Sequence, residues 1–187
     1  IDAGTTQFHK MEVPESWKNC EAQPLGEHIG EGREDAVKFV KNIQAVVNAQ
    51  EGNKLPVSAF VDYVDGTTPS GTAAFEKRGV AVDVPVWNPT NCIQCNFCSY
   101  VCPHAVIRPI ALNEEEAAAA PAGMKMKDMT GMPGYKFAMT VSVADCTGCG
   151  SCVNVCPGMR GAKALTMESY PTQLAEQEIY AYGQNTS

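Results

Sequence analysis

The chain has 187 residues, with 14 lysines and arginines against 21 aspartates and glutamates, so its formal charge is −7 at pH 7. Its apolar fraction of 44% is that of a globular protein of one or two domains, and the acidic balance argues against a nucleic-acid binder, which needs a basic face. Apolar runs stay below the 18 residues or so that a membrane span requires, so no membrane partner is expected. Because the chain starts at Ile1 rather than Met, we expect a processed or excised start, with any targeting segment lost.

Residues 1–79 are predicted to form an N-terminal extension. A short helix is expected around 15–20, and apolar residues at helical spacing predict a packing helix over 33–50. A strand is predicted at 57–61. The turn-rich stretch 65–79 matches no nucleotide-binding motif and is interpreted as a structural loop. The extension is therefore expected to be α/β.

Residues 80–170 are predicted to form a second domain, and 171–187 a C-terminal connecting tail. Alternating apolar residues predict strands in the second domain, at 80–86, 137–143 and 164–167. An insertion is expected at about 112–136. It begins with a helix over 113–120, since Asn113 can cap it and three glutamates follow. Beyond that helix the methionine-rich part of the insertion is interpreted as a surface excursion.

Two copies of one cysteine pattern dominate the second domain. The spacing C-x2-C-x2-C-x3-C-P occurs first at Cys92, Cys95, Cys98, Cys102 and Pro103, and again at Cys146, Cys149, Cys152, Cys156 and Pro157. This spacing is typical of bacterial ferredoxins that bind [4Fe–4S] clusters, in which the fourth cysteine of each run ligates the other cluster. The fold class predicted is thus α+β, a bacterial 2[4Fe–4S] ferredoxin-like module with the N-terminal extension and the insertion added.

The crossed ligation gives two predicted ligand sets. The first [4Fe–4S] cluster is expected on Cys92, Cys95, Cys98 and Cys156. The second is expected on Cys146, Cys149, Cys152 and Cys102. These eight cysteines are the predicted metal ligands, and no catalytic residue is predicted because no nucleophile–base arrangement is found.

Two other uses of the cysteines stay open. Eight paired cysteines could form four disulfides, as in small secreted scaffolds, and C-x2-C pairs also bind zinc. Three thiols in succession at x2 spacing, repeated with the same terminal proline, favour the clusters over both. Cys20 matches no pattern and is expected to be a small buried apolar residue.

The two cysteine loops differ in the residues between their ligands. Gly148 and Gly150 in the second loop correspond to Gln94 and Asn96 in the first. Glycine permits a positive φ and lets amides approach sulfur, so we expect the two reduction potentials to differ, in an order that the sequence does not give. His104 is interpreted as a packing or surface residue. A dry shell around the clusters is predicted from Ile93, Phe97, Tyr100, Val101, Val153 and Val155.

Several segments together resemble the ferredoxin-like domain of the pyruvate:ferredoxin (2-oxoacid:ferredoxin) oxidoreductases. They are 55–59, 65–67, 76–82, 84–87, 91–98, 101–109 and 145–152. The resemblance implies an electron-transfer segment of an oxidoreductase that decarboxylates pyruvate to acetyl-CoA. It also implies that electrons pass from thiamine diphosphate through the clusters to an external ferredoxin or flavodoxin. Thiamine diphosphate, magnesium and a third [4Fe–4S] cluster are expected only in other domains of the parent enzyme.

The resemblance further implies partners and a location. The partners are the remaining domains or subunits of the oxidoreductase, in a parent that is a homo-oligomer, a dimer. The location is cytoplasmic, or the lumen of a reducing organelle in a eukaryote. At 187 residues, the chain is expected to be a fragment or a split subunit. The alternatives are a free-standing dicluster ferredoxin-type carrier or a wiring subunit of another redox complex.

Overall fold

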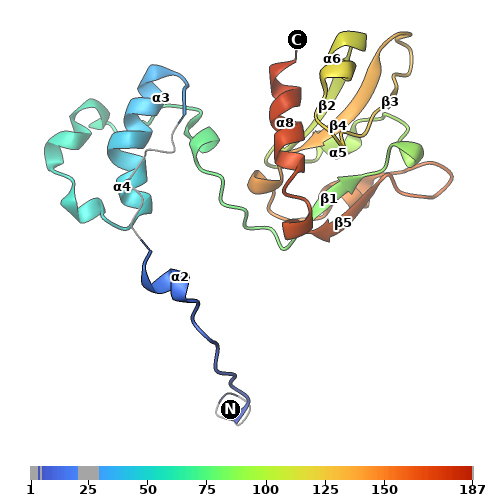
Figure 1. Ribbon diagram of the computed structural model, residues 1–187. Helices are drawn as coiled ribbons and strands as arrows, with labels where there is room; N and C mark the ends of the chain where they lie inside the picture. The colour runs from blue at the N-terminus through green and yellow to red at the C-terminus, as the bar shows by residue number, and fades with distance from the viewer. Residues whose placement is uncertain (1–3, 5, 21–29, 187) are drawn as a thin grey trace. The chain divides into compact units, whose positions relative to one another are not determined.

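The computed structural model describes residues 4, 6–20 and 30–186, and divides into two compact units, 1–76 and 77–187 (Figure 1). Each unit is described by itself. Among the described residues, no helix is long and apolar enough to cross a bilayer.

The first unit is built on one helix in three parts, α3 (Glu34–Phe39), a π-helical turn (Val40–Gln44) and α4 (Ala45–Asn48). This confirms the predicted packing helix, and its buried side is formed by Ala36, Val40 and Ile43. The short helix expected near residue 15 is present as α2 (Glu15–Lys18). Further 3₁₀ turns cover Gly52–Lys54 and Thr72–Phe75.

The predicted strand at 57–61 is wrong, because Val57–Tyr63 forms a 3₁₀-helix. Branched residues favour strands when a neighbouring strand supplies a half-buried surface, and Val57 is instead 91% exposed. The segment is held onto α3 by an edge-to-face contact between Phe39 and Tyr63, with ring centroids 5.0 Å apart. The described residues of this unit therefore contain helices and loops rather than the α/β extension that was expected.

The second unit contains two small antiparallel sheets whose strands come from opposite halves of the duplication. In the first half, β1 (Asp83–Trp87) leads to a cysteine loop, α5 (Phe97–Tyr100) and β2 (Ile107–Leu112). In the second half, β4 (Lys136–Val141) leads to a loop, α7 (Ser151–Val155) and β5 (Leu165–Ser169). The predicted repeat of strand, loop, helical turn and strand is confirmed, and β1 pairs with β5 while β2 pairs with β4.

Strand β1 was predicted at 80–86 with its four valines on one side. It begins at Asp83, and Val84 is fully buried while Val80 and Val82 are 63% and 80% exposed. The β1–β5 ladder ends at the pair Asp83 and Ser169, and just before it the Val82 carbonyl accepts a bond from the Tyr170 amide at 2.9 Å.

The core of this unit draws residues from both sheets, including Ile107, Leu112, Val141 and Leu165, all 1% exposed or less. The predicted helix after Asn113 is present as α6 (Glu114–Ala119), with a capping box in which Asn113 and Glu116 bond each other's backbone amides.

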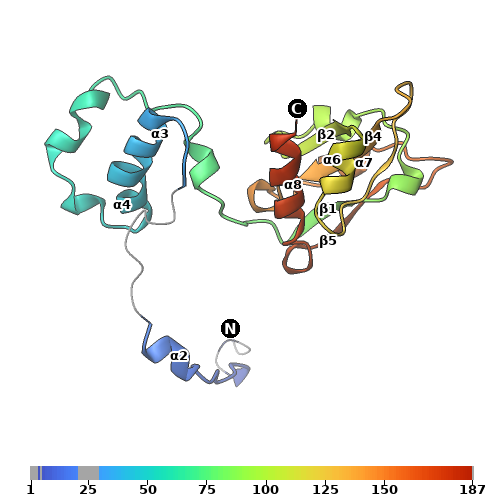
Figure 2. The same cartoon turned by 45° about the horizontal axis from the view of Figure 1, so that its top comes forward.

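Two segments behave differently from the sequence expectation. The residues predicted as a connecting tail contain α8 (Glu176–Asn185), which packs across β4 and β2 with Ile179 buried (Figures 1 and 2). The methionine-rich part of the insertion lies on the core, because its β3 (Lys127–Asp128) pairs with β4 and Met124 is buried.

Candidate iron–sulfur sites

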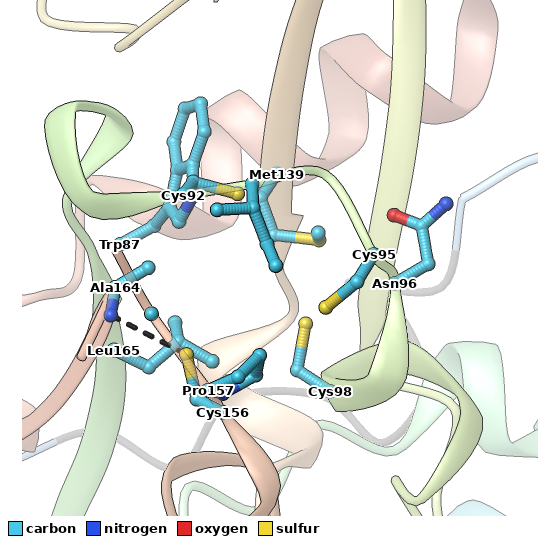
Figure 3. A pocket seen from close by; sticks show the side chains of 12 residues that line it. Trp87, Cys92, Cys95, Asn96, Cys98, Met139, Cys156, Pro157, Ala164 and Leu165 are labelled. Carbon is cyan, nitrogen blue, oxygen red and sulfur yellow. Dashed lines mark hydrogen bonds between the residues drawn. The ribbon is translucent and has the colours of Figure 1, made fainter. Parts of the chain in front are cut away.

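The first cavity of the second unit is lined by four cysteines, Cys92, Cys95, Cys98 and Cys156. Three come from the first cysteine loop and the fourth from the end of the second. The cavity offers about 330 Å³ of free space, part of it open to solvent, and its four sulfurs face a common space (Figure 3). The other wall residues are mainly apolar, among them Trp87, Ile93, Met139, Ala164 and Leu165.

The second cavity repeats the arrangement with the loops exchanged. It offers about 340 Å³ of free space, part of it open to solvent, and is lined by Cys146, Cys149, Cys152 and Cys102. Its walls include Pro85, Val106, Ile107 and Met167, with Thr147 and His104 at its edge. The structure thus brings together the four cysteines of each predicted set.

Strand pairing explains why the fourth cysteine crosses over. β5 returns to lie beside β1, and α5 packs against α7, so the end of each cysteine loop lies at the start of the other. An amide then fixes each crossing thiol. The Val106 amide donates to Cys102 Sγ at 3.3 Å, and the Ala164 amide donates to Cys156 Sγ at 3.3 Å.

The donor sets fit cubane clusters. All nine cysteines are free thiols, and each cavity offers four of them in a mainly apolar wall. Four thiolates are the ligand set of a [4Fe–4S] cluster, and two cavities of nearly equal volume suit two copies of one group. Within the described residues, no group of three or more histidines, cysteines or acidic residues is arranged around a single metal ion.

Two residues that line the first cavity each have a buried side-chain polar atom without a hydrogen-bond partner among the described atoms. These atoms are Trp87 Nε1 and Asn96 Oδ1, although the Asn96 side chain points away from the four sulfurs (Figure 3). A buried donor without a partner costs free energy, and an occupant rich in sulfur acceptors would satisfy the indole N–H.

The backbone of the two loops is matched in spite of their different sequences. Gln94 and Asn96 adopt φ values of 59° and 61°, close to the 70° and 73° of Gly148 and Gly150. The Gln94 amide donates to Cys92 Sγ at 3.4 Å, as the Gly148 amide does to Cys146 Sγ at 3.4 Å. These two amides therefore do not distinguish the two sites.

A steric constraint also favours glycine at position 148. A Cβ there would lie 3.1 Å from the carbonyl oxygen of Asp83, a backbone atom held in the β1–β5 ladder. A Cβ at Gly150 would meet nothing within 4 Å. The two glycines share a left-handed backbone, but only the first lies against β1.

The predicted apolar shell is largely wrong. Tyr100 is 84% exposed and Phe97 53%, and Val101 and Val155 are also exposed. Of the six residues, Ile93 lines a cavity and Val153 packs against the core. These side chains project outward because α5 and α7 are short and bury only the face that carries cysteines. Residues of the strands therefore form most of the cavity walls instead.

Two further expectations have mixed outcomes. His104 is exposed, as expected of a surface residue, but it also borders the second cavity. Cys20 is exposed rather than buried, and its thiol donates to the Ser16 carbonyl at 3.2 Å. It lines neither cavity.

Sequence reasoning missed the contacts that the insertion makes with the first loop. Lys127 Nζ donates to the carbonyl oxygens of Pro89 and Cys92, and the side chain of Gln94 bonds the backbone of Asp128 and Thr130. The only sequence signal was a glutamine where the second loop has glycine.

Burial keeps several ligand thiols protonated when no iron is bound. It raises the pKa of Cys98 to about 12 and that of Cys152 to about 11. The pKa of exposed Cys149 is lowered, first by its hydrogen bond with the Ser151 hydroxyl. Thiolates are the iron ligands, so cluster assembly must release protons and is favoured as the pH rises.

The fold and the two four-thiol cavities define the class of this protein, a 4Fe–4S dicluster protein. A family model described as a 4Fe–4S dicluster domain matches residues 91–162, and the EKR model, described as a domain of unknown function, matches residues 28–81.

The chain is 44% identical over 182 residues to a pyruvate-flavodoxin oxidoreductase of Klebsiella pneumoniae, covering 97% of this chain and 15% of that protein. It is 43% identical over 169 residues to a pyruvate:ferredoxin oxidoreductase of Moorella thermoacetica, covering 89% of this chain and 14% of the relative. A pyruvate dehydrogenase [NADP(+)] of Cryptosporidium parvum is 46% identical over 126 residues, 66% of this chain and 6% of the relative. The chain therefore corresponds to a segment of the pyruvate-flavodoxin and pyruvate:ferredoxin oxidoreductases, and it spans 15% of the length of the Klebsiella pneumoniae relative and 6% of the Cryptosporidium parvum relative.

The two loop glycines give a matched test of the second site. Alanine at either position meets the left-handed backbone strain of about 1–2 kcal/mol, and Gly148→Ala adds the close approach to Asp83. We expect Gly148→Ala to lose cluster content and apparent thermal stability clearly more than Gly150→Ala. Visible absorption and thermal unfolding of the loaded protein measure this. Equal losses would show that the contact with β1 has no role.

Proposed function

We propose that this chain is the electron-transfer segment of a pyruvate-oxidising enzyme. In this proposal the first [4Fe–4S] cluster is held by Cys92, Cys95, Cys98 and Cys156. The second is held by Cys146, Cys149, Cys152 and Cys102. The observation that carries the proposal is the pair of cavities, each lined by one such set of four thiols.

When bound, each cluster supplies a site that takes up and releases one electron at a time. The protein's own residues do the rest. The cysteines hold the irons in place, and amides such as those of Gln94 and Gly148 donate hydrogen bonds to ligand sulfur. Buried strand residues, including Leu165 and Ile107, keep water from the cavity walls. Both cavities belong to one compact unit, which suits transfer between neighbouring centres.

The wider role is inferred from the named relatives. We propose that electrons reach this segment from the oxidative decarboxylation of pyruvate to acetyl-CoA at thiamine diphosphate, and leave to an external ferredoxin or flavodoxin. Thiamine diphosphate, magnesium and a third [4Fe–4S] cluster would reside in other domains of a dimeric parent. Nine free thiols suit a reducing compartment, the cytoplasm or a reducing organelle lumen.

The crossed ligation predicts an unexpected spectrum for one variant. Cys102→Ala removes a residue of the first motif but should perturb the second cluster, so its electron paramagnetic resonance spectrum should match that of Cys146→Ala. Cys20→Ala is the control, because this thiol lines neither cavity, and it should leave both clusters unchanged. A Cys102→Ala spectrum that matches Cys92→Ala would reverse the assignment.

The relay itself can be tested in the complete enzyme. With Cys102→Ala, we expect the initial single-turnover release of carbon dioxide from pyruvate to persist while pyruvate-dependent reduction of flavodoxin falls at least tenfold. Cys20→Ala should support both. Flavodoxin reduction at the normal rate in Cys102→Ala, with the second cluster shown to be absent, would exclude this cluster from the path.

A further inference from the structure

A lysine of the insertion is held against the first cysteine loop. Lys127 Nζ donates to the carbonyl oxygen of Cys92 at 2.8 Å and to that of Pro89 at 2.9 Å, and both contacts are partly buried. Cys92 is itself buried and lines the first cavity. A positive charge is thus fixed directly behind a ligand of the first site.

The side chain of Gln94 keeps this lysine in place. Its Nε2 donates to the carbonyl oxygen of Asp128 at 2.8 Å, and its Oε1 accepts from the Thr130 amide at 2.9 Å. These bonds join the loop to the segment that follows Lys127. This accounts for a glutamine at a left-handed position where the second loop has Gly148.

The charge of Lys127 is not cancelled by its neighbour Asp128. The carboxylate of Asp128 is paired with Lys136, at 2.5 Å between Oδ1 and Nζ, and this pairing lowers the pKa of Asp128. The ion pair of Asp128 and Lys136 is exposed and neutral overall, whereas the hydrogen bonds of Lys127 Nζ go to the neutral carbonyl groups of Pro89 and Cys92.

The second loop carries a different charge at its start. The residue before Cys146 is Asp145, whose carboxylate is paired with Lys77 and accepts from the Ser142 hydroxyl at 2.6 Å. The residue before Cys92 is the neutral Asn91. The start of the second loop therefore carries a neutral ion pair, and that of the first carries an uncompensated cation.

A hydrogen-bond donor adds to the difference. Trp87, five residues before Cys92, is buried and lines the first cavity, and its Nε1 has no partner among the described atoms. The matching position in the second half is Val141, which has no side-chain donor. The ring itself is held by an edge contact with Phe137.

We propose that Lys127 and the indole N–H of Trp87 raise the reduction potential of the first cluster above that of the second. This rests on the proposed cluster sites. Uptake of one electron makes a cluster site more negative by one unit, and a nearby cation or hydrogen-bond donor stabilises that state. The amide–sulfur bonds described above are matched between the two sites. The second site has its own side-chain partner, the Ser151 hydroxyl beside exposed Cys149 at 3.5 Å. In this proposal the partly buried contacts of Lys127 and the buried indole of Trp87 outweigh it. Electrons entering the pair come to rest on the first cluster.

The test is a redox titration of the loaded chain followed by electron paramagnetic resonance, which resolves one midpoint potential for each cluster. Lys127→Met should lower the higher midpoint potential by ~59 mV, which is a tenfold change in the equilibrium constant for one-electron reduction. The lower midpoint potential should stay unchanged. Lys127→Arg, which keeps the positive charge, should leave the higher midpoint potential near its wild-type value. Trp87→Phe, which keeps the ring but removes the N–H, should lower the same midpoint.

Lys77→Met is the matched control. It removes the partner of Asp145 beside the second loop, so it should lower the other midpoint. The proposal is contradicted if Lys127→Met and Trp87→Phe leave the higher midpoint unchanged, or if they move the lower one. If the Lys127→Met variant does not bind its clusters, the midpoint potentials of the Trp87→Phe variant decide whether the proposal holds. Failure of the wild-type chain to bind two clusters would instead refute the proposed function.

Discussion

Antiparallel pairing between strands of opposite halves decides where every ligand cysteine lies. β1 with β5 and β2 with β4 lock the two repeats together, so neither half can form its cavity without the other. The fourth cysteine of each loop is carried to the facing cavity by this pairing, and an amide of the returning strand segment bonds its sulfur. Two four-thiol cavities in one compact unit are a consequence of the topology.

The matched loop backbones make the differences between the sites informative. Since Gln94 and Gly148 place their amides alike, a glutamine at a left-handed position calls for a reason in its side chain. That reason is the insertion, which the glutamine fixes on the loop and which brings Lys127 to Cys92. The insertion thereby becomes part of the site rather than a surface addition.

The cysteine spacing predicted which four cysteines line each cavity and predicted the duplicated fold, because the repeated motif is a strong local signal. The capped helix after Asn113 was predictable for the same reason. The strand at 57–61 was not, since β-propensity depends on a neighbouring strand that Val57 lacks. The shell was also misjudged, because proximity to cysteines in sequence does not say which face of a one-turn helix is buried, as Tyr100 shows.

The central claim is that each chain carries two four-iron clusters, one in each four-thiol cavity. The most direct measurement is the content of iron, acid-labile sulfide and zinc per chain after anaerobic reconstitution and desalting. The account predicts about eight irons and eight sulfides with no stoichiometric zinc. About four irons, or zinc in stoichiometric amount, would contradict it.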